Sequence, residues 1–582
     1  MTRIGIVGTG PSGIYSLMHL INLPMPLHIT LFEQNHRAGV GTPYDPETND
    51  PAMLANIASI ELPPVTETLV DWLHDRTDAE LADVHISRGE ISDRAFYPRV
   101  LIGAYYHDQL TKLIKRAEAQ SHTIEVLTCH HVVDVIVHEG DVVIQVEADG
   151  ATRLQAFDYA IVASGHQERD VEEEHEQLDH AYAKRDVETW RDARIGVLGT
   201  SLSAIDVAIG TAAEAGRFVR RKGRLVYVSD DAEASFSVTL MSRRGLLPEA
   251  DFYCPIPYEP LVHCTPEQVG TICTDGKGDC LDRMFELFKT KLTTADPGYA
   301  DGIGLQFLTP DTFAEVYFSA RQRVPALDWA EANLTEAKAN ARARKTVAWR
   351  YAILRMHEVF GNAVKLLDER DRKRFSKGLK QVFIDNYAAV PPLSIERLLA
   401  LRDARKLRVL RLGNDYSLHS DDEGGTTTIQ TEAGEEIFDV MVDARGQPAL
   451  TLQELPFPTL RLQIIANERA NDPSFTVDDV SDLLESGVEV DESYALNDGL
   501  YSLSRVYCLS IPHLLKLHPF IQGLTSCDEL AQAMAASLAD ELAESHTLPH
   551  PGITERVAHF DETSLVYCLS KRQWKADGQR VT

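Results

Sequence analysis

The stretch Arg3-Ile-Gly-Ile-Val-Gly-Thr-Gly-Pro-Ser-Gly13 decides the fold of this chain. Its first half is a short apolar strand of the kind that lies buried in a parallel sheet, and a helical pattern follows its three closing glycines. A second strand covers His28–Glu33, and Glu33 comes twenty positions after Gly13. Strand, glycine spacing, helix and terminal acid together form a dinucleotide-binding fingerprint. The sequence therefore predicts a Rossmann-like βα unit at its start.

The glycines of such a unit have separate roles. Gly8 permits the tight turn, Gly10 lets the backbone approach a pyrophosphate, and Gly13 lets the helix pack closely on the strand. Free N–H groups and the positive end of the helix dipole favour phosphate. Glu33 would accept hydrogen bonds from ribose hydroxyls, and its charge disfavours a 2′-phosphate. The alternative is a plain strand–turn–helix without a ligand.

A second unit of the same kind begins about 190 residues later. Arg194–Leu198 is a buried-strand pattern, and the fingerprint positions that follow it hold Gly199, Ser201 and Ala204. Serine replaces the middle glycine, so this match is weaker by itself than the first. Two such units in one chain predict two nucleotide sites.

The choice of nucleotide at the second site depends on which strand follows the helix. Leu225–Asp230 is a strand pattern that ends in an acid, which suits a ribose 2′-hydroxyl. Val238–Pro248 also contains a strand pattern, which ends in the paired arginines Arg243 and Arg244. Guanidinium groups suit a 2′-phosphate by charge and by bidentate geometry, so we favour NADPH.

Composition narrows the range of partners. The 582 residues carry a formal charge of −31, which disfavours nucleic acid and anionic membrane surfaces as partners. Ile4–Phe32 lacks charged residues, but its glycines and prolines would break a membrane-spanning helix. Eight cysteines in so long a chain make no disulfide framework, and the spacing of the four between 254 and 280 is not that of a structural zinc site. We therefore expect a cytoplasmic protein without a metal.

The rest of the chain predicts strands around a helical middle. Ile124–Cys129, Val132–His138 and Val142–Glu147 resemble an antiparallel meander, and Leu407–Leu412 is expected to begin another. Between residues 249 and 399 apolar side chains recur at helical spacing, and Pro391-Pro392 is expected to end this block. The recurring residues are expected to be core: Trp349, Ile353, Met356, Val359, Phe360, Leu379, Val382 and Phe383.

Further segments complete a family resemblance. They are Gly41–Tyr44, Met53–Asn56, Phe96–Arg99, Gly103–Tyr105, Phe157–His166, Phe438–Gly446, Gly499–Ser502, Val506–Ser510 and Pro519–Gly523. With the two glycine-rich units and Ser242–Pro248, they make the chain resemble a bacterial FAD/NAD(P)-binding family related to class B flavin monooxygenases and N-hydroxylating monooxygenases.

The resemblance implies an α/β fold with two Rossmann-like dinucleotide-binding domains, for FAD and NAD(P)H, and a largely helical insertion. The FAD-binding domain would comprise residues 1–180 and 447–582, and the NAD(P)H-binding domain residues 181–248 and 400–446. Residues 249–399 would form the helical insertion or cap.

The resemblance also implies site residues. Asn56 near the flavin and Arg99 beside the cofactor are the candidate catalytic residues, and each has a purely structural alternative. His166 is a less favoured acid–base candidate. The candidate cofactor-binding residues are Gly8, Gly10, Pro11, Ser12, Gly13, Glu33, Gln34, Thr42, Asn56, Ala163, Gly165, Gly199, Thr200, Ser201, Ser203, Arg243, Arg244, Gln522 and Gly523.

The implied protein is an enzyme: an FAD-dependent, NADPH-using monooxygenase that N-hydroxylates a small amine or amino acid with O2 through a hydroperoxyflavin. A homo-oligomer is compatible with the sequence. The alternatives are an NAD(P)H oxidase and a non-catalytic regulatory flavoprotein. A flavin disulfide reductase would need a redox cysteine pair beside the flavin, and no cysteine precedes Cys129.

Overall fold

The structure is a computed structural model that describes residues 1–165, 179–180, 190–230, 235–421, 425–446, 448–472, 474–521 and 523–547. The chain divides into two compact units, Met1–Ala536 and Ser537–Thr582. Of the second unit, only the end of helix α19 (Gly523–Thr547) is described. The following concerns the first unit.

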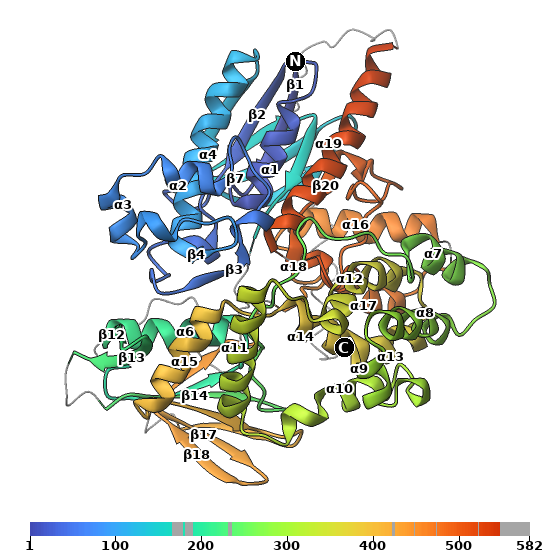
Figure 1. The fold of residues 1–582 in the computed structure, drawn as a ribbon. Coiled ribbons are helices and arrows are strands. Elements are labelled where there is room, and N and C mark those ends of the chain that lie inside the picture. The colour runs from blue at the N-terminus through green and yellow to red at the C-terminus, as the bar shows by residue number, and fades with distance from the viewer. Residues whose placement is uncertain are drawn as a thin grey trace, which may run out of the picture. The chain divides into compact units, whose positions relative to one another are not determined.

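The amino-terminal fingerprint forms the centre of a parallel sheet. Strand β1 (Thr2–Val7) pairs with β2 (Leu27–Phe32) on one side and β9 (Tyr159–Val162) on the other, and helix α1 (Pro11–Leu20) connects β1 to β2. The outer strands are β5 (Thr123–Leu127) and β20 (Val506–Cys508), so that the order is β20-β9-β1-β2-β5. Figure 1 shows β1 and β2 of this sheet next to α1. The end of the chain thus returns to the sheet that its beginning starts.

The second fingerprint forms the centre of another sheet with the same plan. The order is β10-β19-β11-β14-β15, and the pairings are parallel throughout. Its strands are β11 (Arg194–Leu198), β14 (Ser237–Ser242), β15 (Leu407–Arg411), β19 (Val440–Asp443) and β10 (Asp179–His180). In both sheets the glycine-rich strand is central and the next parallel strand lies beside it. Two parallel sheets of this plan confirm the predicted fold class.

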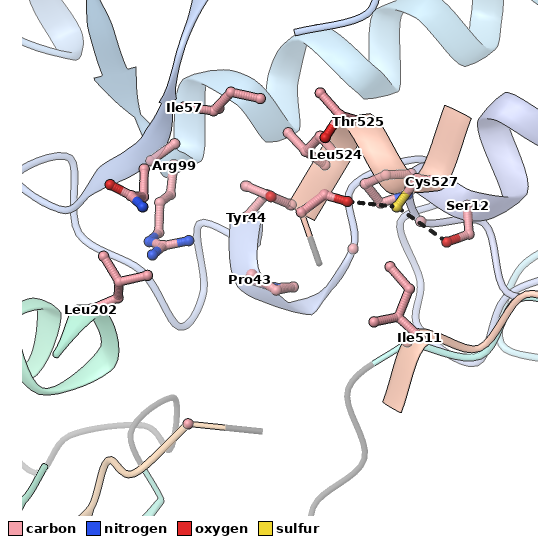
Figure 2. A pocket seen from close by; sticks show the side chains of 18 of the residues that line it. Ser12, Pro43, Tyr44, Ile57, Arg99, Leu202, Ile511, Leu524, Thr525 and Cys527 are labelled. Carbon is pink, nitrogen blue, oxygen red and sulfur yellow. Dashed lines mark hydrogen bonds between the residues drawn. The ribbon is translucent and has the colours of Figure 1, made fainter. Parts of the chain in front are cut away.

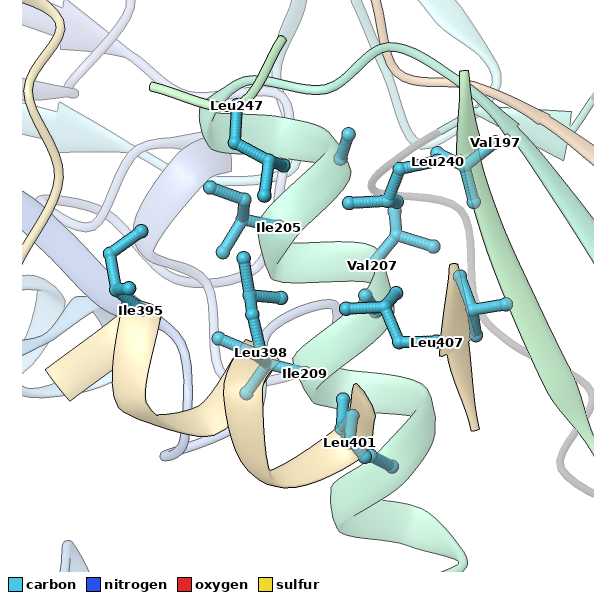
Figure 3. Close-up of a cluster of buried hydrophobic side chains, with 14 of the residues drawn as sticks. Val197, Ile205, Val207, Ile209, Leu240, Leu247, Ile395, Leu398, Leu401 and Leu407 are labelled. Atoms are coloured by element: carbon cyan, nitrogen blue, oxygen red, sulfur yellow. The ribbon is translucent and has the colours of Figure 1, made fainter. Parts of the chain in front are cut away.

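Two helices cover one face of the second sheet. Helices α6 (Leu202–Glu214) and α15 (Pro392–Asp403) pack together, and Figure 3 shows Ile205 and Ile209 of α6 beside Leu398 of α15. These side chains are at most 2% exposed. Burial of each stabilises the fold by about 1.5–3 kcal/mol, which fixes where α6 starts relative to the sheet.

Two strands that we expected to begin meanders lie in the parallel sheets instead. β5 and β15 each follow a helix, α4 (Arg99–Ala119) and α15, that carries the chain back along the sheet, so the next strand enters parallel at an edge. The expected meanders were therefore wrong in their first strands. The antiparallel sheets are β6 (His131–Val137), β7 (Val142–Ala148) and β8 (Ala151–Phe157), and β16 (Ser417–Asp421), β17 (Thr426–Thr431) and β18 (Gly434–Phe438).

The strand that ends at Asp230 is not part of a parallel sheet either. β13 (Arg224–Ser229) pairs antiparallel with β12 (Gly216–Arg221) in a two-stranded hairpin. Asp230 lies 2.5 Å from Arg217 of this hairpin, and both side chains are exposed. The strand that follows α6 in the sheet is β14, which leads into Arg243. The alternative in which Asp230 follows the second strand of the nucleotide-binding sheet is therefore wrong.

The middle of the chain is helical, as predicted. The expected core residues Ile353, Met356, Leu379, Val382 and Phe383 are at most 1% exposed and share one apolar core. Pro391-Pro392 does not end the helical block, because Pro392 begins α15. The helices are α7 (Pro266–Thr274), α8 (Cys280–Ala295), α9 (Pro297–Gly302), α10 (Phe313–Gln322), α11 (Ala326–Ala343), α12 (Ala348–Ala363), α13 (Glu369–Lys377) and α14 (Leu379–Tyr387).

The other strands and α-helices of this unit lie between or after the sheets and the helical middle. They are β3 (Leu54–Ala58), β4 (Phe96–Pro98), α2 (Leu69–His74), α3 (Asp78–Asp83), α16 (Pro458–Asn471), α17 (Val477–Glu485) and α18 (Ile511–Leu514). Among the described residues, no helix combines the length and apolar character needed to cross a bilayer.

Candidate functional site

The first glycine-rich turn lies against the end of strand β9. Gly8 has a φ of +101°, and a Cβ on it would lie 2.5 Å from the Ala163 carbonyl oxygen. A Cβ on Gly13 would lie 2.1 Å from the Gly8 carbonyl oxygen. Gly10 differs, because a Cβ there would meet only Gly41 Cα at an ordinary 3.5 Å. Protein contacts therefore require glycine at positions 8 and 13, whereas at position 10 they leave space beside the start of α1.

The carboxylate of Glu33 is fixed beside this turn. Glu33 follows β2 and is 9% exposed. The Thr9 hydroxyl donates to Glu33 Oε2 at 2.5 Å, and the Asn35 N–H donates to Oε1 at 2.9 Å. Thr9 Oγ1 also accepts a hydrogen bond from the Gly39 N–H at 2.9 Å. The carboxylate is thus held as an acceptor next to the glycine-rich turn.

The second turn repeats this arrangement with a different strand end. Gly199 has a φ of +135°, and a Cβ on it would lie 2.4 Å from the Ala444 carbonyl oxygen. Ser201 is the N-cap of α6, and no side chain caps that helix start. The Thr200 hydroxyl donates to Ser242 Oγ at 3.1 Å, in the position where Thr9 donates to Glu33. The neutral Ser242 therefore takes the place of the acid.

Arginines surround the end of β14. Arg243 is exposed, and so is Arg411, which pairs in register with Ser242 from the neighbouring strand β15. Neither guanidinium has a carboxylate partner among the described residues. Arg244 packs over the Phe318 ring at 4.4 Å, and burial lowers the pKa of its guanidinium. Arg411 was missed at the level of sequence because only the pairing of β14 with β15 brings it beside Arg243.

One cavity of about 1730 Å³ reaches both turns. Its lining includes Gly8–Ser12 of the first turn, Ser201–Ser203 at the start of α6, and side chains of the helical middle. Figure 2 shows part of it, with Arg99 and Leu202 on one side, Ser12 on the other and Tyr44 between them. A molecule at either turn would therefore border the same space.

Most of the predicted site residues border this cavity. Those that line it are Gly8, Gly10, Pro11, Ser12, Glu33, Gln34, Thr42, Asn56, Arg99, Ala163, Gly165, Ser201, Ser203 and Gly523. Gly13, Gly199, Thr200, Arg243 and Arg244 are not among the lining residues. His166 and Gln522 lie outside the described residues. The roles assigned to all of these residues stay predictions.

Asn56 has an available acceptor in the cavity wall. Its amide Oδ1 is buried and has no hydrogen-bond partner within the described part of the chain. A buried polar atom left unpaired costs free energy, and a bound ligand with a donor would remove that cost.

Arg99 joins the two nucleotide units. Its Nε and Nη2 both lie 2.9 Å from Asp206 Oδ2, and the two residues are 8% and 5% exposed. Arg99 begins α4, beside the first glycine-rich βα unit, whereas Asp206 belongs to α6 of the second glycine-rich βα unit. This buried ion pair fixes the start of α6 relative to the first turn.

A carboxyl pair borders the same cavity. The Tyr258 hydroxyl donates to Glu61 Oε1 at 2.8 Å, and Asp251 lies nearby in the cavity wall. Burial, and then the negative charge of Glu61, raises the pKa of Asp251 to about 7. Asp251 can therefore exchange a proton near neutral pH. No sequence spacing indicated this group, because residues 61 and 251 meet only in the fold.

Two thiols also line the cavity. The Ser12 hydroxyl donates to Cys527 Sγ at 3.3 Å (Figure 2), and Cys254 lies beside the carboxyl pair. Burial raises the pKa of the Cys527 thiol to about 11 and that of Cys254 to about 12. Neither Sγ contacts another cysteine among the described residues. These thiols are protonated and isolated, unlike the redox pair of a disulfide reductase.

Comparison with known proteins identifies the family. Residues 5–167 match the FAD-NAD(P)-binding family, and residues 265–387 match the YdhS-like middle domain. The protein YdhS of Escherichia coli (strain K12) is 40% identical over 540 residues, which cover 92% of this chain and 97% of that protein. The chain belongs to the YdhS family. The first of these matches confirms the predicted FAD/NAD(P)-binding domain at the amino terminus.

Solved structures match most of the chain, but at low similarity. The ornithine N-hydroxylase of Kutzneria sp. 744 is 13% identical, with a TM-score of 0.46 over 93% of this YdhS-family chain and 99% of that chain. The ornithine hydroxylase PvdA of Pseudomonas aeruginosa is also 13% identical, with a TM-score of 0.47 over the same shares. The bacillithiol disulfide reductase of Staphylococcus aureus is 9% identical, with a TM-score of 0.40 over 93% of this chain and 99% of that chain. Similarity this low does not identify a shared reaction.

The Arg99–Asp206 pair yields a stability prediction. Arg99→Met removes the guanidinium from a buried carboxylate, and we expect a loss of about 3 kcal/mol in stability, measured as a lower thermal unfolding midpoint. Adding Asp206→Leu removes the charge as well and should restore most of the loss. A double variant as unstable as Arg99→Met would contradict this account of the pair.

Proposed function

We propose that this protein is an FAD- and NADPH-dependent oxidoreductase that uses O2 to oxygenate a small amine. The observation that carries the proposal is one shared cavity, which borders the first glycine-rich turn and the start of α6 after the second and extends into the helical middle. Two cofactors that exchange hydride must meet in one space, and a substrate needs room beside them.

The first turn fits FAD. The space beside Gly10 and the uncapped start of α1 suit a pyrophosphate, and the fixed Glu33 carboxylate suits ribose hydroxyls. Asn56 offers its unpaired oxygen to a donor on the bound group. When bound, FAD would supply the hydride acceptor and the reaction with O2.

The second turn fits NADPH better than NADH. The neutral Ser242 stands where an acid would accept from a 2′-hydroxyl, and Arg243 and Arg411 supply two positive charges beside it. A 2′-phosphate is dianionic and matches such a pair of guanidinium groups. Arg244 is a poorer candidate than we expected, because its side chain packs on Phe318.

The chain's own residues would position and enclose the reactants. Arg99 and Asp206 keep the two turns at a fixed separation, and Asp251 could take or give a proton at its carboxyl oxygen. The isolated thiols give no support to disulfide reduction. The choice of an amine as substrate rests on the family resemblance of the sequence.

A variant of Gly10 tests the flavin site. In Gly10→Val the φ of −67° accepts valine, the new Cβ meets only Gly41 Cα at an ordinary 3.5 Å, and the side chain would occupy the proposed pyrophosphate space. We expect a folded protein whose flavin content falls at least about tenfold. Gly89→Val, at an exposed glycine with open space around it, is the matched control and should stay yellow. If purified Gly10→Val contained as much flavin as the unchanged protein, the assignment of the flavin site to this turn would be wrong.

Variants at the end of β14 test the coenzyme choice. Arg243→Ala and Arg411→Ala should each raise the Michaelis constant for NADPH roughly tenfold and leave that for NADH nearly unchanged. Asp230→Ala is the control, because Asp230 belongs to the exposed hairpin, and it should change neither constant. A change of coenzyme preference in Asp230→Ala alone would contradict the assignment.

The activity itself is tested by following NADPH and oxygen together. Purified protein supplied with NADPH and a panel of small amines should consume NADPH faster with its substrate. With isotopically labelled O2, one labelled atom should then appear in the product. If every amine only increased peroxide release, the protein would be an NADPH oxidase, and oxygenation would be abandoned.

A further inference from the structure

Helix α14 presents one face to the cavity and the other to the protein core. Lys380, Ile384 and Tyr387 line the cavity, and their spacing of four and three residues places them on one side of the helix. Val382 and Phe383 are at most 1% exposed and belong to the apolar core of the helical middle. Lys380, on the cavity side, is not part of this apolar core.

Lys380 is a desolvated cation without a counter-ion. Within the described part of the chain its ammonium has no carboxylate or hydrogen-bond partner, and burial lowers its pKa. Glu358, the acidic residue of α12 that lines the cavity, lies 3.4 Å from Arg355. An unpaired ammonium removed from water is costly, so an anionic ligand at this place would gain free energy.

Two further polar groups of α14 are unpaired. The Tyr387 hydroxyl is buried without a partner among the described residues, and so are both amide atoms of Asn386, a residue only 1% exposed that also lines the cavity. A hydroxyl and an amide N–H are donors, and with an ammonium they match the acceptor-only oxygens of a carboxylate.

Aromatic rings hold Tyr387 in place. Its ring centroid lies 5.8 Å from that of Phe520 and 5.3 Å from that of His357. His357 Nδ1 donates to the Leu354 carbonyl oxygen, and burial lowers the pKa of this imidazole. Burial therefore favours the neutral imidazole, so the positive charge on this wall comes from Lys380.

We infer that α14 forms the subsite for a carboxylate of the substrate, held by the Lys380 ammonium, the Tyr387 hydroxyl and the Asn386 amide. The inference rests on the proposed function, since it takes the substrate to be a small amine, and it adds that this amine carries a carboxylate. The substrate class is then a small amino acid. The subsite lies in the YdhS-like middle domain, which no requirement of the two cofactors explains.

The test measures binding, so that it does not depend on turnover. Calorimetric titration of the full chain as purified, without NADPH, would use straight-chain ω-amino carboxylates from 3-aminopropanoate to 6-aminohexanoate. The alkylamine and the aminoalkylphosphonate of each chain length are the matched probes. The variants are Lys380→Met and Tyr387→Phe, with Lys377→Met on the exposed end of α13 as the control.

We expect the best amino carboxylate to bind at least about tenfold more tightly than its alkylamine. Lys380→Met should abolish that difference, Tyr387→Phe should reduce it, and Lys377→Met should retain it. Equal binding of carboxylate and alkylamine, or an unchanged preference in Lys380→Met, would overturn the inference. Binding of the phosphonates alone would show a phosphate subsite instead and would also overturn it.

Binding and turnover measured on the same protein distinguish a failure of this inference from a failure of the proposed function. If it binds amino carboxylates through Lys380 but oxygenates none of them, the subsite stands and the proposed function fails. If it oxygenates alkylamines and amino carboxylates with equal Michaelis constants, the function stands and the subsite is wrong.

Discussion

The close approach of a glycine to the end of the neighbouring strand occurs twice in this protein, and the rest of the structure depends on it. The carbonyl oxygens of Ala163 and Ala444 leave no space for a Cβ on Gly8 and Gly199. Each contact forces a left-handed turn that only glycine adopts freely, and each turn exposes the start of a helix. The Arg99–Asp206 ion pair connects α4, beside the first glycine-rich turn, to α6. The starts of α1 and α6 therefore border the same cavity.

The two sites differ chiefly in the residue that the threonine of the turn contacts. Thr9 binds the Glu33 carboxylate, whereas Thr200 binds the Ser242 hydroxyl with Arg243 next in the chain. The same strand–turn–helix backbone thus carries a negative charge after β2 at the first site and a positive charge after β14 at the second. This contrast, more than the glycine spacing, supports different nucleotides at the two places.

The sequence predicted what is encoded by neighbouring residues. Local sequence was enough to predict the strand, turn and helix around Gly8 and Gly199, and also the core face of α12. The spacing of residues alone determines which side chains share a face. β5 and β15 were misassigned since their sheet partners are set by the helix before them and not by their own alternation. The sequence did not predict the roles of Arg411, Asp251 and the cavity face of α14, because these depend on contacts between segments far apart in the chain.

The central claim is that two dinucleotides meet in one cavity, and anaerobic mixing of the flavin-loaded protein with NADPH tests it most directly. The account predicts that the visible absorption band of the oxidised flavin disappears, and that NADPH deuterated at the transferred position slows its disappearance. A protein that binds NADPH while its flavin stays oxidised would contradict the account.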